Sequence, residues 1–297
     1  MLEMRGKSLL HKTGALTSAV LACLLLWADG IDWHPSYETA LQAGKRNGRL
    51  VYVFVYLPRR ATCAQMDQRT FKDPQVRSLL SGFECGAVDA STQEGGAFVE
   101  RYKIQYIRDP QTGIKLATVP AHVFFRPDGT ILHRQYGFIP PPGFVALLQR
   151  VKRLHELQVA LRQGPNNARI VSELSHLLLL LGYDEEGRRY AEMAVALDPT
   201  NAVGARERAH LDLAILTIKR DPQLAIERLL RWLEDYRGSK NRVEAQFYLA
   251  TAYVAADQVE KAQAVLAPFE RAKKGTPEAD SEWGARARAL LKALREQ

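Results

Sequence analysis

The chain has 297 residues, enough for about two domains of ordinary size. With 46% hydrophobic and 25% charged residues, its composition is that of a globular protein and excludes a disordered or low-complexity one. The formal net charge of +8 is spread along the chain, and no basic stripe alternates with aromatic residues, so the sequence indicates no nucleic-acid partner.

The N-terminal segment, residues 1–30, has the pattern of a secretory signal peptide. Three basic residues lie within its first twelve positions, and a largely apolar run of 14 residues follows from Ala15 to Ala28. Ala28-Asp29-Gly30 then fits the small-x-small pattern at which such signals are cleaved. These features predict an exported, periplasmic protein.

Two features of the same segment bear on a membrane association. The apolar run is shorter than the about 20 residues that a membrane-spanning helix needs, which favours cleavage over an uncleaved anchor. Val20-Leu21-Ala22-Cys23 resembles a bacterial lipoprotein box, but the apolar run continues past Cys23, which is the wrong place for lipidation. Membrane attachment would therefore require an uncleaved signal or lipidation at Cys23.

The segment 31–160 alternates helical and strand-like patterns. Apolar residues at helical spacing predict helices, and short apolar or aromatic runs predict strands. In chain order, the expected elements are a helix over 36–45, strand Leu50–Leu57, a helical stretch Thr62–Leu80 interrupted at Asp73-Pro74, strand Phe83–Asp89, helix Gly95–Tyr102, strands Ala121–Phe125 and Ile131–Tyr136 joined by a turn, and helix Phe144–Leu157. This order predicts an α/β domain.

The residues after the first predicted strand carry the most specific motif of the chain. Cys63 to Val76 reads C-A-Q-M-D-Q-R-T-F-K-D-P-Q-V, and Thr118-Val119-Pro120 is followed by Val123-Phe124-Phe125 and Asp128-Gly129. Both segments resemble those of the exported thioredoxin-like domains, a family that includes the periplasmic C-terminal domain of the DsbD thiol reductant. The resemblance covers residues 33–155 and implies a thioredoxin-like fold, a central mixed sheet with flanking helices.

The resemblance also implies that the dithiol chemistry of the family is lost. In the segment Arg60-Ala61-Thr62-Cys63, Arg60 stands where the attacking cysteine of a Cys-x-x-Cys pair would be, and exchange by such a pair needs both thiols. Phe54 stands where these domains carry a buried acid that accepts a proton, so the general base is missing as well. A redox cycle with two cysteines is therefore excluded.

By the same resemblance, Pro120 would be a cis-proline beside the active-site turn. A cis bond would let Val119 present its N–H and C=O to an extended peptide; the alternative is that Pro120 begins an ordinary strand. The link before Pro120 is expanded by the polar stretch 107–115, which we expect to lie near Arg60 as a recognition or shielding loop. Arg60, Val119 and Pro120 are the predicted peptide-binding residues.

Cys63 is the candidate catalytic residue, and the sequence leaves two roles open for it. A helix N-terminus and the neighbouring Arg59 and Arg60 favour a thiolate, whereas the second cysteine position of such folds is normally buried and unreactive. Cys63 is therefore either a structural thiol or a reactive monothiol. Cys85 falls inside a predicted central strand, where we expect a small core residue and where a disulfide with Cys63 is disfavoured.

The histidines indicate no metal site. His122 and His133 flank the predicted hairpin, but no third ligand follows at a recognisable spacing. We expect surface or capping roles for both, and no resident metal or cofactor.

Beyond a linker at 161–168, the segment 169–297 reads as helical throughout and repeats. Two positions recur together, with spacings of 38 and 37 residues. They are Gly187, Ala225 and Ala262, and Ala194, Trp232 and Phe269. Such a period is typical of a repeat array, and a plain helical bundle is the alternative.

The units of this array resemble tetratricopeptide repeats. The first unit, Arg169–Pro199, and the third, Val243–Lys273, fit well, while the middle unit, Ala209–Tyr236, fits loosely. Ser281–Arg295 is expected to be a polar capping helix. The resemblance implies an all-α, tetratricopeptide-like (TPR-like) domain with a concave groove that binds a peptide or a partner protein.

The sequence leads to two hypotheses of function. The first is an exported protein-binding or assembly module of the cell envelope that has lost its two-cysteine redox site. Its protein or peptide partners would bind at the Pro120 face and in the TPR-like groove. The alternative is a monothiol thiol–disulfide oxidoreductase, or a redox partner, that uses Cys63.

Overall fold

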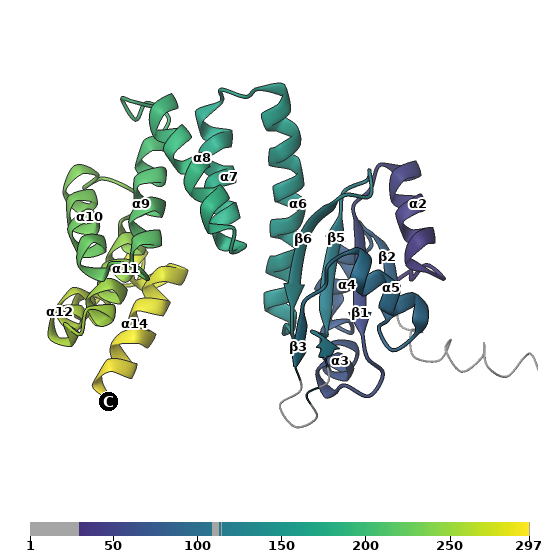
Figure 1. Cartoon of the computed structure of the whole chain (residues 1–297). Helices are drawn as coiled ribbons and strands as arrows, with labels where there is room; N and C mark the ends of the chain where they lie inside the picture. Colours follow the sequence, from purple (N-terminus) through teal and green to yellow (C-terminus); the bar gives the residue numbers. More distant parts are fainter. Residues whose placement is uncertain (1–29, 109–112, 114, 297) are drawn as a thin grey trace, which may run out of the picture. The chain divides into compact units, whose positions relative to one another are not determined.

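The computed structural model of the chain describes residues 30–108, 113 and 115–296 (Figure 1). It forms two compact units, with the division between Lys152 and Arg153. Residues 1–29 of the predicted signal peptide, including Cys23, lie outside the described residues, as do residues 109–112 and 114 of the predicted recognition loop. The domain limits 31–160 and 169–297 stay predictions.

The first unit is built on a four-stranded mixed sheet. In the order β2-β1-β5-β6, its strands are β2 (Glu84–Asp89), β1 (Val51–Tyr56), β5 (Ala121–Phe125) and β6 (Ile131–Tyr136). β1 runs parallel to β2 and antiparallel to β5, and β6 runs antiparallel to β5. The helices are α2 (Tyr37–Asn47), α3 (Ala61–Gln65), α4 (Pro74–Leu80), α5 (Gln93–Arg101) and the first part of α6 (Pro141–Gln163). This mixed sheet with flanking helices is thioredoxin-like, so the predicted fold class is confirmed.

Strand β1 lies inside the sheet and is buried on both faces. From Val51 to Val55, no residue is more than 2% exposed. A strand covered on both faces has no polar side to show, which explains the continuous apolar run in the sequence. The ladders place Val55 beside Val88 of β2 and Ala121 of β5. The turn that follows β1 therefore lies at the end of the sheet where β2 ends and β5 begins.

The helical stretch after β1 is divided, as the Asp73-Pro74 pair predicts. α3 continues into a π-helical segment, η1 (Met66–Thr70), and α4 begins at Pro74. The Asp73 carboxylate caps α4 by accepting hydrogen bonds from the N–H groups of Gln75 and Val76 at 2.9 and 3.1 Å. Pro74 suits the first helical position because it has no N–H to leave unpaired there.

A second, two-stranded sheet differs from the polar loop expected at 107–115. β3 (Tyr106–Arg108) and β4 (Lys115–Ala117) pair antiparallel, with Ile107 opposite Leu116. The expectation of a loop is therefore wrong at both ends of this segment. Strand pairing is favoured here because it satisfies the backbone groups of both ends and sets two apolar residues opposite each other.

The second unit is built from helices, as the sequence predicts. After the last part of α6 come α7 (Ala168–Leu180), α8 (Asp184–Leu197), α9 (Ala205–Thr217), α10 (Pro222–Asp235), α11 (Arg242–Ala255), α12 (Val259–Glu270), α13 (Pro277–Asp280) and α14 (Glu282–Arg295). α7 packs on α8, α9 on α10 and α11 on α12. α14 is the helix expected at the end of the array, and Ser281 caps it by accepting a hydrogen bond from the Gly284 N–H at 3.0 Å. Among the described helices, none has both the length and the apolar content needed to cross a membrane.

The recurring positions of the sequence fall at equivalent places in α8, α10 and α12. The fourth residues of these helices are Gly187, Ala225 and Ala262, and the eleventh are Ala194, Trp232 and Phe269. All of them are buried. At Gly187 a Cβ would lie 2.4 Å from Leu179 Cδ2, so a larger residue there would have to displace the Leu179 side chain. The residues that recur in the sequence are therefore the ones that pack at equivalent positions of α8, α10 and α12.

Candidate functional site

The turn after β1 exposes Arg60 and buries Cys63. Arg60 has an extended backbone, with φ −85° and ψ 119°, and precedes the first turn of α3. Its C=O accepts hydrogen bonds from the N–H groups of Cys63 and Ala64 at 3.0 and 3.1 Å. The Arg60 side chain is exposed, whereas Cys63 is 4% exposed. The charge of this turn therefore faces solvent and its sulfur faces the core.

The Cys63 sulfur is held as a thiol. Burial raises the pKa of Cys63 above its ordinary value. A hydrogen bond with the Leu57 backbone and the positive charge of Arg60 act in the opposite direction, but burial outweighs them. Because the thiolate is the nucleophilic form, burial and the raised pKa both disfavour reaction of this thiol in the folded chain.

Cys85 is a buried residue of β2. It is 2% exposed, and burial together with the charge of Glu84 raises its pKa to about 12. β2 lies at the edge of the four-stranded sheet and not at its centre as expected, and Trp33 extends it through an isolated bridge to Cys85. Cys63 and Cys85 are free thiols.

Within residues 30–108, 113 and 115–296, no group of three His, Cys, Asp or Glu side chains could hold a metal ion.

Aromatic rings fill the place where the family resemblance puts a buried acid. Phe54 is 2% exposed, and its ring centroid lies 5.0 Å from that of Phe71 in an edge-to-face contact at 90°. The ring centroids of Tyr56 and His122 lie 5.7 and 5.8 Å from that of Phe54. The position is part of a packed core, and its side chain can accept no proton.

The peptide bond between Val119 and Pro120 is cis, as the resemblance implied. In the antiparallel ladder, Val55 lies opposite Ala121. The next residues outward are Tyr56, the last residue of β1, and Pro120, so the Val119–Pro120 bond lies beside the end of β1. Pro120 and the turn that carries Cys63 therefore lie at the same edge of the sheet.

Val119 and Pro120 are buried, with Val119 8% exposed, and the described residues leave the backbone groups of Val119 unpaired. On one side of it, the Thr118 N–H donates to the Gln105 C=O at 2.7 Å, and on the other the Pro120 C=O accepts from the Gly137 N–H at 2.8 Å. Between them, the Val119 N–H and C=O form no hydrogen bond with the described part of the chain. A donor and an acceptor on one residue can pair with an extended peptide, as in strand addition.

His122 and His133 are buried, which corrects the surface or capping roles expected for them. They are 0% and 1% exposed, and burial lowers the pKa of each to about 4. His122 Nδ1 lies 2.9 Å from Tyr52 Oη, and His122 Nε2 lies 3.1 Å from the Gly137 carbonyl oxygen. Since a carbonyl only accepts, Nε2 carries the proton and Nδ1 accepts from the tyrosine hydroxyl. The bond from Tyr52 needs the neutral ring, whereas the Nε2–H group donates to Gly137 in either protonation state.

His122 also connects the core to the Val119–Pro120 turn. Gly137 accepts from His122 through its C=O and donates to Pro120 through its N–H. Sequence reasoning missed this link because Tyr52 and Gly137 are 70 and 15 residues away from His122. The apolar residues on both sides of His122 are the signal that could have indicated burial.

In the second unit, a buried charge network joins α7, α9 and α11. Arg208 Nη1 lies 2.6 Å from Glu244 Oε2, and Arg208 Nε lies 3.0 Å from Asp212 Oδ1. His176 Nδ1 lies 3.0 Å from the same Asp212 oxygen. Burial alone would raise the pKa of Asp212, but the Arg208 charge and the His176 hydrogen bond outweigh it and lower the pKa. The Asp212 carboxylate therefore stays ionised and joins α9 to α7, while Arg208 joins α9 to α11 through Glu244.

A small cleft of about 160 Å³ lies beside this network and is lined by residues of α7, α9 and α11. Leu180, at the end of α7, lines it and is 42% exposed.

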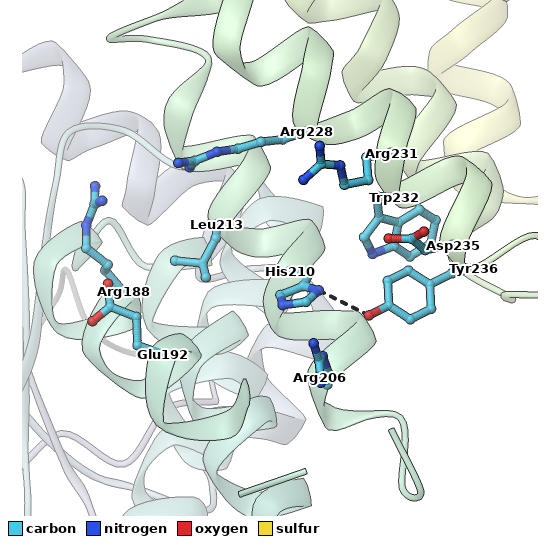
Figure 2. Close-up of a pocket in the computed structure, with 10 residues that line it drawn as sticks. All are labelled: Arg188, Glu192, Arg206, His210, Leu213, Arg228, Arg231, Trp232, Asp235 and Tyr236. Carbon is cyan, nitrogen blue, oxygen red and sulfur yellow. Dashed lines mark hydrogen bonds between the residues drawn. The ribbon is translucent and has the colours of Figure 1, made fainter. Parts of the chain in front are cut away.

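A larger cleft of about 480 Å³ lies between α8, α9 and α10 (Figure 2). Its lining includes Arg188, Arg206, Arg228, Arg231, Trp232 and Tyr236. Sequence reasoning missed it because the arginines come from three helices. Arg206 and His210, four residues apart, and positions 228, 231 and 235 repeat at helical spacing, and this spacing is the signal that could have indicated two polar faces.

Comparison with solved structures gives thioredoxin-like proteins over the N-terminal part of the chain. A thioredoxin from Thermus thermophilus is 27% identical over 41% of this chain and 87% of that one, with a TM-score of 0.35. The DsbD C-terminal domain of Neisseria meningitidis in the oxidised form is 18% identical over 38% and 91%, with a TM-score of 0.31. A DsbH oxidoreductase is 16% identical over 49% and 94%, with a TM-score of 0.33. No protein-family model and no curated protein matches the chain.

Proposed function

We propose that this chain is an exported protein-binding or assembly module of the cell envelope. In it, a thioredoxin-like unit without dithiol chemistry is joined to a TPR-like helical array. The observation that supports the proposal most directly is the turn after β1, where the exposed position carries the Arg60 guanidinium and the remaining sulfur, Cys63, is buried.

Thiol–disulfide exchange by two cysteines needs an exposed thiolate that attacks and a second thiol that resolves the mixed disulfide. Arg60 cannot attack a disulfide, and Cys63 is 4% exposed with a raised pKa. Cys85 is enclosed in β2 and has a pKa of about 12. Neither described sulfur is both accessible and ionised, so neither can make the first attack on a disulfide that dithiol exchange requires.

At the same end of the sheet, the exposed Arg60 and the buried Val119–Pro120 segment offer groups for binding in place of a nucleophile. Val119 has an N–H and a C=O that the described fold leaves unpaired. Pro120 lies beside Tyr56, the last residue of β1, and Arg60 follows Tyr56 by four residues. An extended peptide could pair its backbone with Val119 and set an acidic side chain against the Arg60 guanidinium. Arg60, Val119 and Pro120 are therefore our candidate peptide-binding residues.

The TPR-like part of the proposal is supported by the equivalent packing positions in α8, α10 and α12. A repeat array buries each unit on its neighbour and leaves an extended face for a ligand. We assign this face to α7, α9 and α11, which share the Arg208 network and the cleft beside Leu180. Export rests on the signal-like pattern of residues 1–30.

A monothiol oxidoreductase that uses Cys63 is the second candidate. The Leu57 hydrogen bond and the Arg60 charge favour it, because both act to lower the pKa of the thiol. In that reaction the Cys63 thiolate attacks one sulfur of a disulfide, a mixed disulfide forms, and the other sulfur leaves as a thiolate that takes up a proton. A thiol from a second protein would have to release Cys63.

The catalytic arm of the test is insulin reduction by dithiothreitol, with and without the full chain. We expect no acceleration over dithiothreitol alone, and turnover would contradict the proposal. For the monothiol alternative, the chain and its Cys63→Ser variant are incubated with glutathione disulfide, and adducts are mapped by mass spectrometry. An adduct on Cys63 that forms in minutes at pH 7 would favour the alternative.

The binding arm uses extended decapeptides selected from a displayed library on the full chain. We expect Arg60→Glu to weaken their binding by about tenfold or more, because a guanidinium–carboxylate contact would become a repulsion. Arg69→Glu is the matched control, since Arg69 is also exposed and the change of charge is the same. Equal effects of the two variants would remove Arg60 from the binding surface.

A further inference from the structure

The cleft between α8, α9 and α10, called the arginine cleft below, is separate from the face with the Arg208 network. Arg206, His210 and Leu213 line the arginine cleft and are spaced by four and three residues, so they share one face of α9. Arg208 is two residues from Arg206 and lies on the other side of the helix, because each residue turns an α-helix by about 100°. The two clefts therefore use opposite faces of α9.

Three guanidiniums of the arginine cleft, those of Arg206, Arg228 and Arg231, form no ion pair with the described residues. Arg231 forms no hydrogen bond or ion pair with the residues that the structure describes. Arg228 donates to a neutral group, Thr217 Oγ1, at 2.8 Å, and Arg206 donates to the Pro199 C=O. These three guanidiniums are therefore available as anion partners.

Arg188 is the fourth guanidinium, and it is also incompletely paired. Its Nε is buried and has no hydrogen-bond acceptor in the described part of the chain. Its nearest carboxylate, Glu185 Oε2, lies 3.9 Å away on a side chain that is 71% exposed. A contact of this length to an exposed carboxylate contributes little. The Arg188 side chain is 30% exposed and lines the cleft, so the rest of its guanidinium can contact an anion there.

The cleft also contains two carboxylates, Glu192 and Asp235, and one imidazole. Neither carboxylate lies within ion-pair distance of a described arginine. His210 is bonded through Nδ1 to Tyr236 Oη at 3.1 Å, and burial and the Arg206 charge lower its pKa. His210 is therefore neutral at pH 7. The positive charge in the cleft comes from the arginines alone, and it exceeds the negative charge of the two carboxylates.

The arrangement of the arginines decides the kind of anion. Figure 2 shows the guanidinium groups of Arg188, Arg206 and Arg228 around the cleft and not gathered at one point. A compact anion such as phosphate needs donors that converge on it, whereas a ligand with several carboxylates can meet donors that are spread out. The volume of about 480 Å³ accommodates a few side chains and not a folded domain.

We propose that the arginine cleft binds an acidic segment of a polypeptide, with neighbouring carboxylates on guanidiniums of α8, α9 and α10. This inference rests on the proposed function in one respect, that the chain binds other proteins. It adds a second binding site, on the helical unit, with a stated partner chemistry. It also predicts strong weakening by salt, since the contacts are between charges near the surface.

The test measures binding of a fluorescein-labelled hexaglutamate peptide to the full chain by fluorescence anisotropy at low ionic strength. The double variant Arg228→Glu/Arg231→Glu is expected to weaken binding by about tenfold or more. The matched control is Lys273→Glu/Lys274→Glu, which changes the net charge equally at exposed positions outside the cleft and should weaken binding less than about twofold. Unchanged thermal unfolding of both variants verifies that the helices are intact.

Three results would overturn the proposal. The first is no measurable binding of hexaglutamate to the unmodified chain, and the second is an equal loss in both double variants, which would reveal attraction by net charge alone. The third is competition by inorganic phosphate at a lower concentration than by unlabelled hexaglutamate, which would assign the cleft to small anions. None of these results changes the insulin or Arg60 measurements, so the two proposals can fail independently.

Discussion

The Cys63 turn and the arginine cleft place their functional groups in opposite environments. Cys63 is 4% exposed, and burial keeps it protonated, whereas Arg231 is exposed and has no partner among the described residues. A thiol loses its reactivity when it is buried, but a guanidinium stays charged at any ordinary pH. The comparison teaches that this chain exposes arginines, which bind anions without any change of protonation. It buries Cys63, which would have to lose a proton in order to react.

The largest effect is expected when the acid of the family pattern is restored. Phe54→Asp would set a carboxylate among the rings of Phe71, Tyr56 and His122, and we expect the free energy of unfolding to fall by about 4 kcal/mol. Urea unfolding of the full chain measures this. Phe54→Leu, which keeps the site apolar, should cost about 1–2 kcal/mol. If both variants lost the same amount, the enclosed apolar character of the Phe54 site would be refuted.

A second large effect should follow from acid. The folded-state pKa of His122 is about 4, below its ordinary value of 6.5, so the unfolded chain binds this proton more tightly. The stability that the neutral ring contributes is complete above about pH 6.5, and it is lost as the pH falls towards 4, at a cost of roughly 3 kcal/mol. Unfolding free energies measured from pH 7 to 4 report it.

The variant His122→Leu separates this effect from general acid sensitivity. It should be less stable at pH 7, because Tyr52 and Gly137 lose their partner, but its stability should depend less on pH between 6.5 and 4. His133, with the same low pKa, would still contribute its own part. An unchanged pH dependence in His122→Leu would show that this ring is not the proton acceptor.

A smaller effect is expected from the packing of the helical unit. Gly187→Ala would set a Cβ 2.4 Å from Leu179 Cδ2, and the forced movement of the Leu179 side chain should cost about 1 kcal/mol. Gly238→Ala is the control, since nothing lies within 4 Å of its Cβ position, and it should change stability by less than about 0.5 kcal/mol. Thermal unfolding of the two variants compares them, and equal midpoints would refute the tight contact.

The smallest change in stability, and a clear change in chemistry, is expected from Arg60→Cys. Arg60 is exposed, so the cost should stay within about 0.5 kcal/mol. In a Cys23→Ser background under phosphine reduction, a maleimide should add once to the variant, at position 60, and not to the parent chain. Mass spectrometry counts the adducts. Rapid addition to Cys63 in the parent chain would contradict the comparison between an enclosed sulfur and an open surface.

The sequence predicted those parts of the fold that depend on local patterns. β5 and β6 have the expected limits, the helix break falls at Asp73-Pro74, and the recurring residues of the helical unit occupy equivalent packing positions. Each of these follows from residues close together in the chain or from a fixed period. They could therefore be predicted without a structure.

The parts that the sequence did not predict depend on residues brought together by the fold. The burial of His122 depends on Tyr52 and Gly137, which lie in other strands or beyond them. The burial of His133 follows from its pairing opposite Phe124 in the sheet. The arginine cleft requires three helices at once. No local pattern encodes such neighbours, so the candidate site could be predicted only where the family resemblance supplied it.

The enclosure of both sulfurs has a consequence for how the folded state can be observed. Cys63 lies in a helix of five residues, while Cys85 lies under the packing of the sheet edge. Each sulfur can react with a thiol reagent only when its own surroundings open. The rates of labelling at the two positions would therefore measure the opening free energies of α3 and β2 separately in one molecule. In an oxidising compartment, a chain that had failed to fold would offer both sulfurs for cross-linking, whereas the folded chain would offer neither of them.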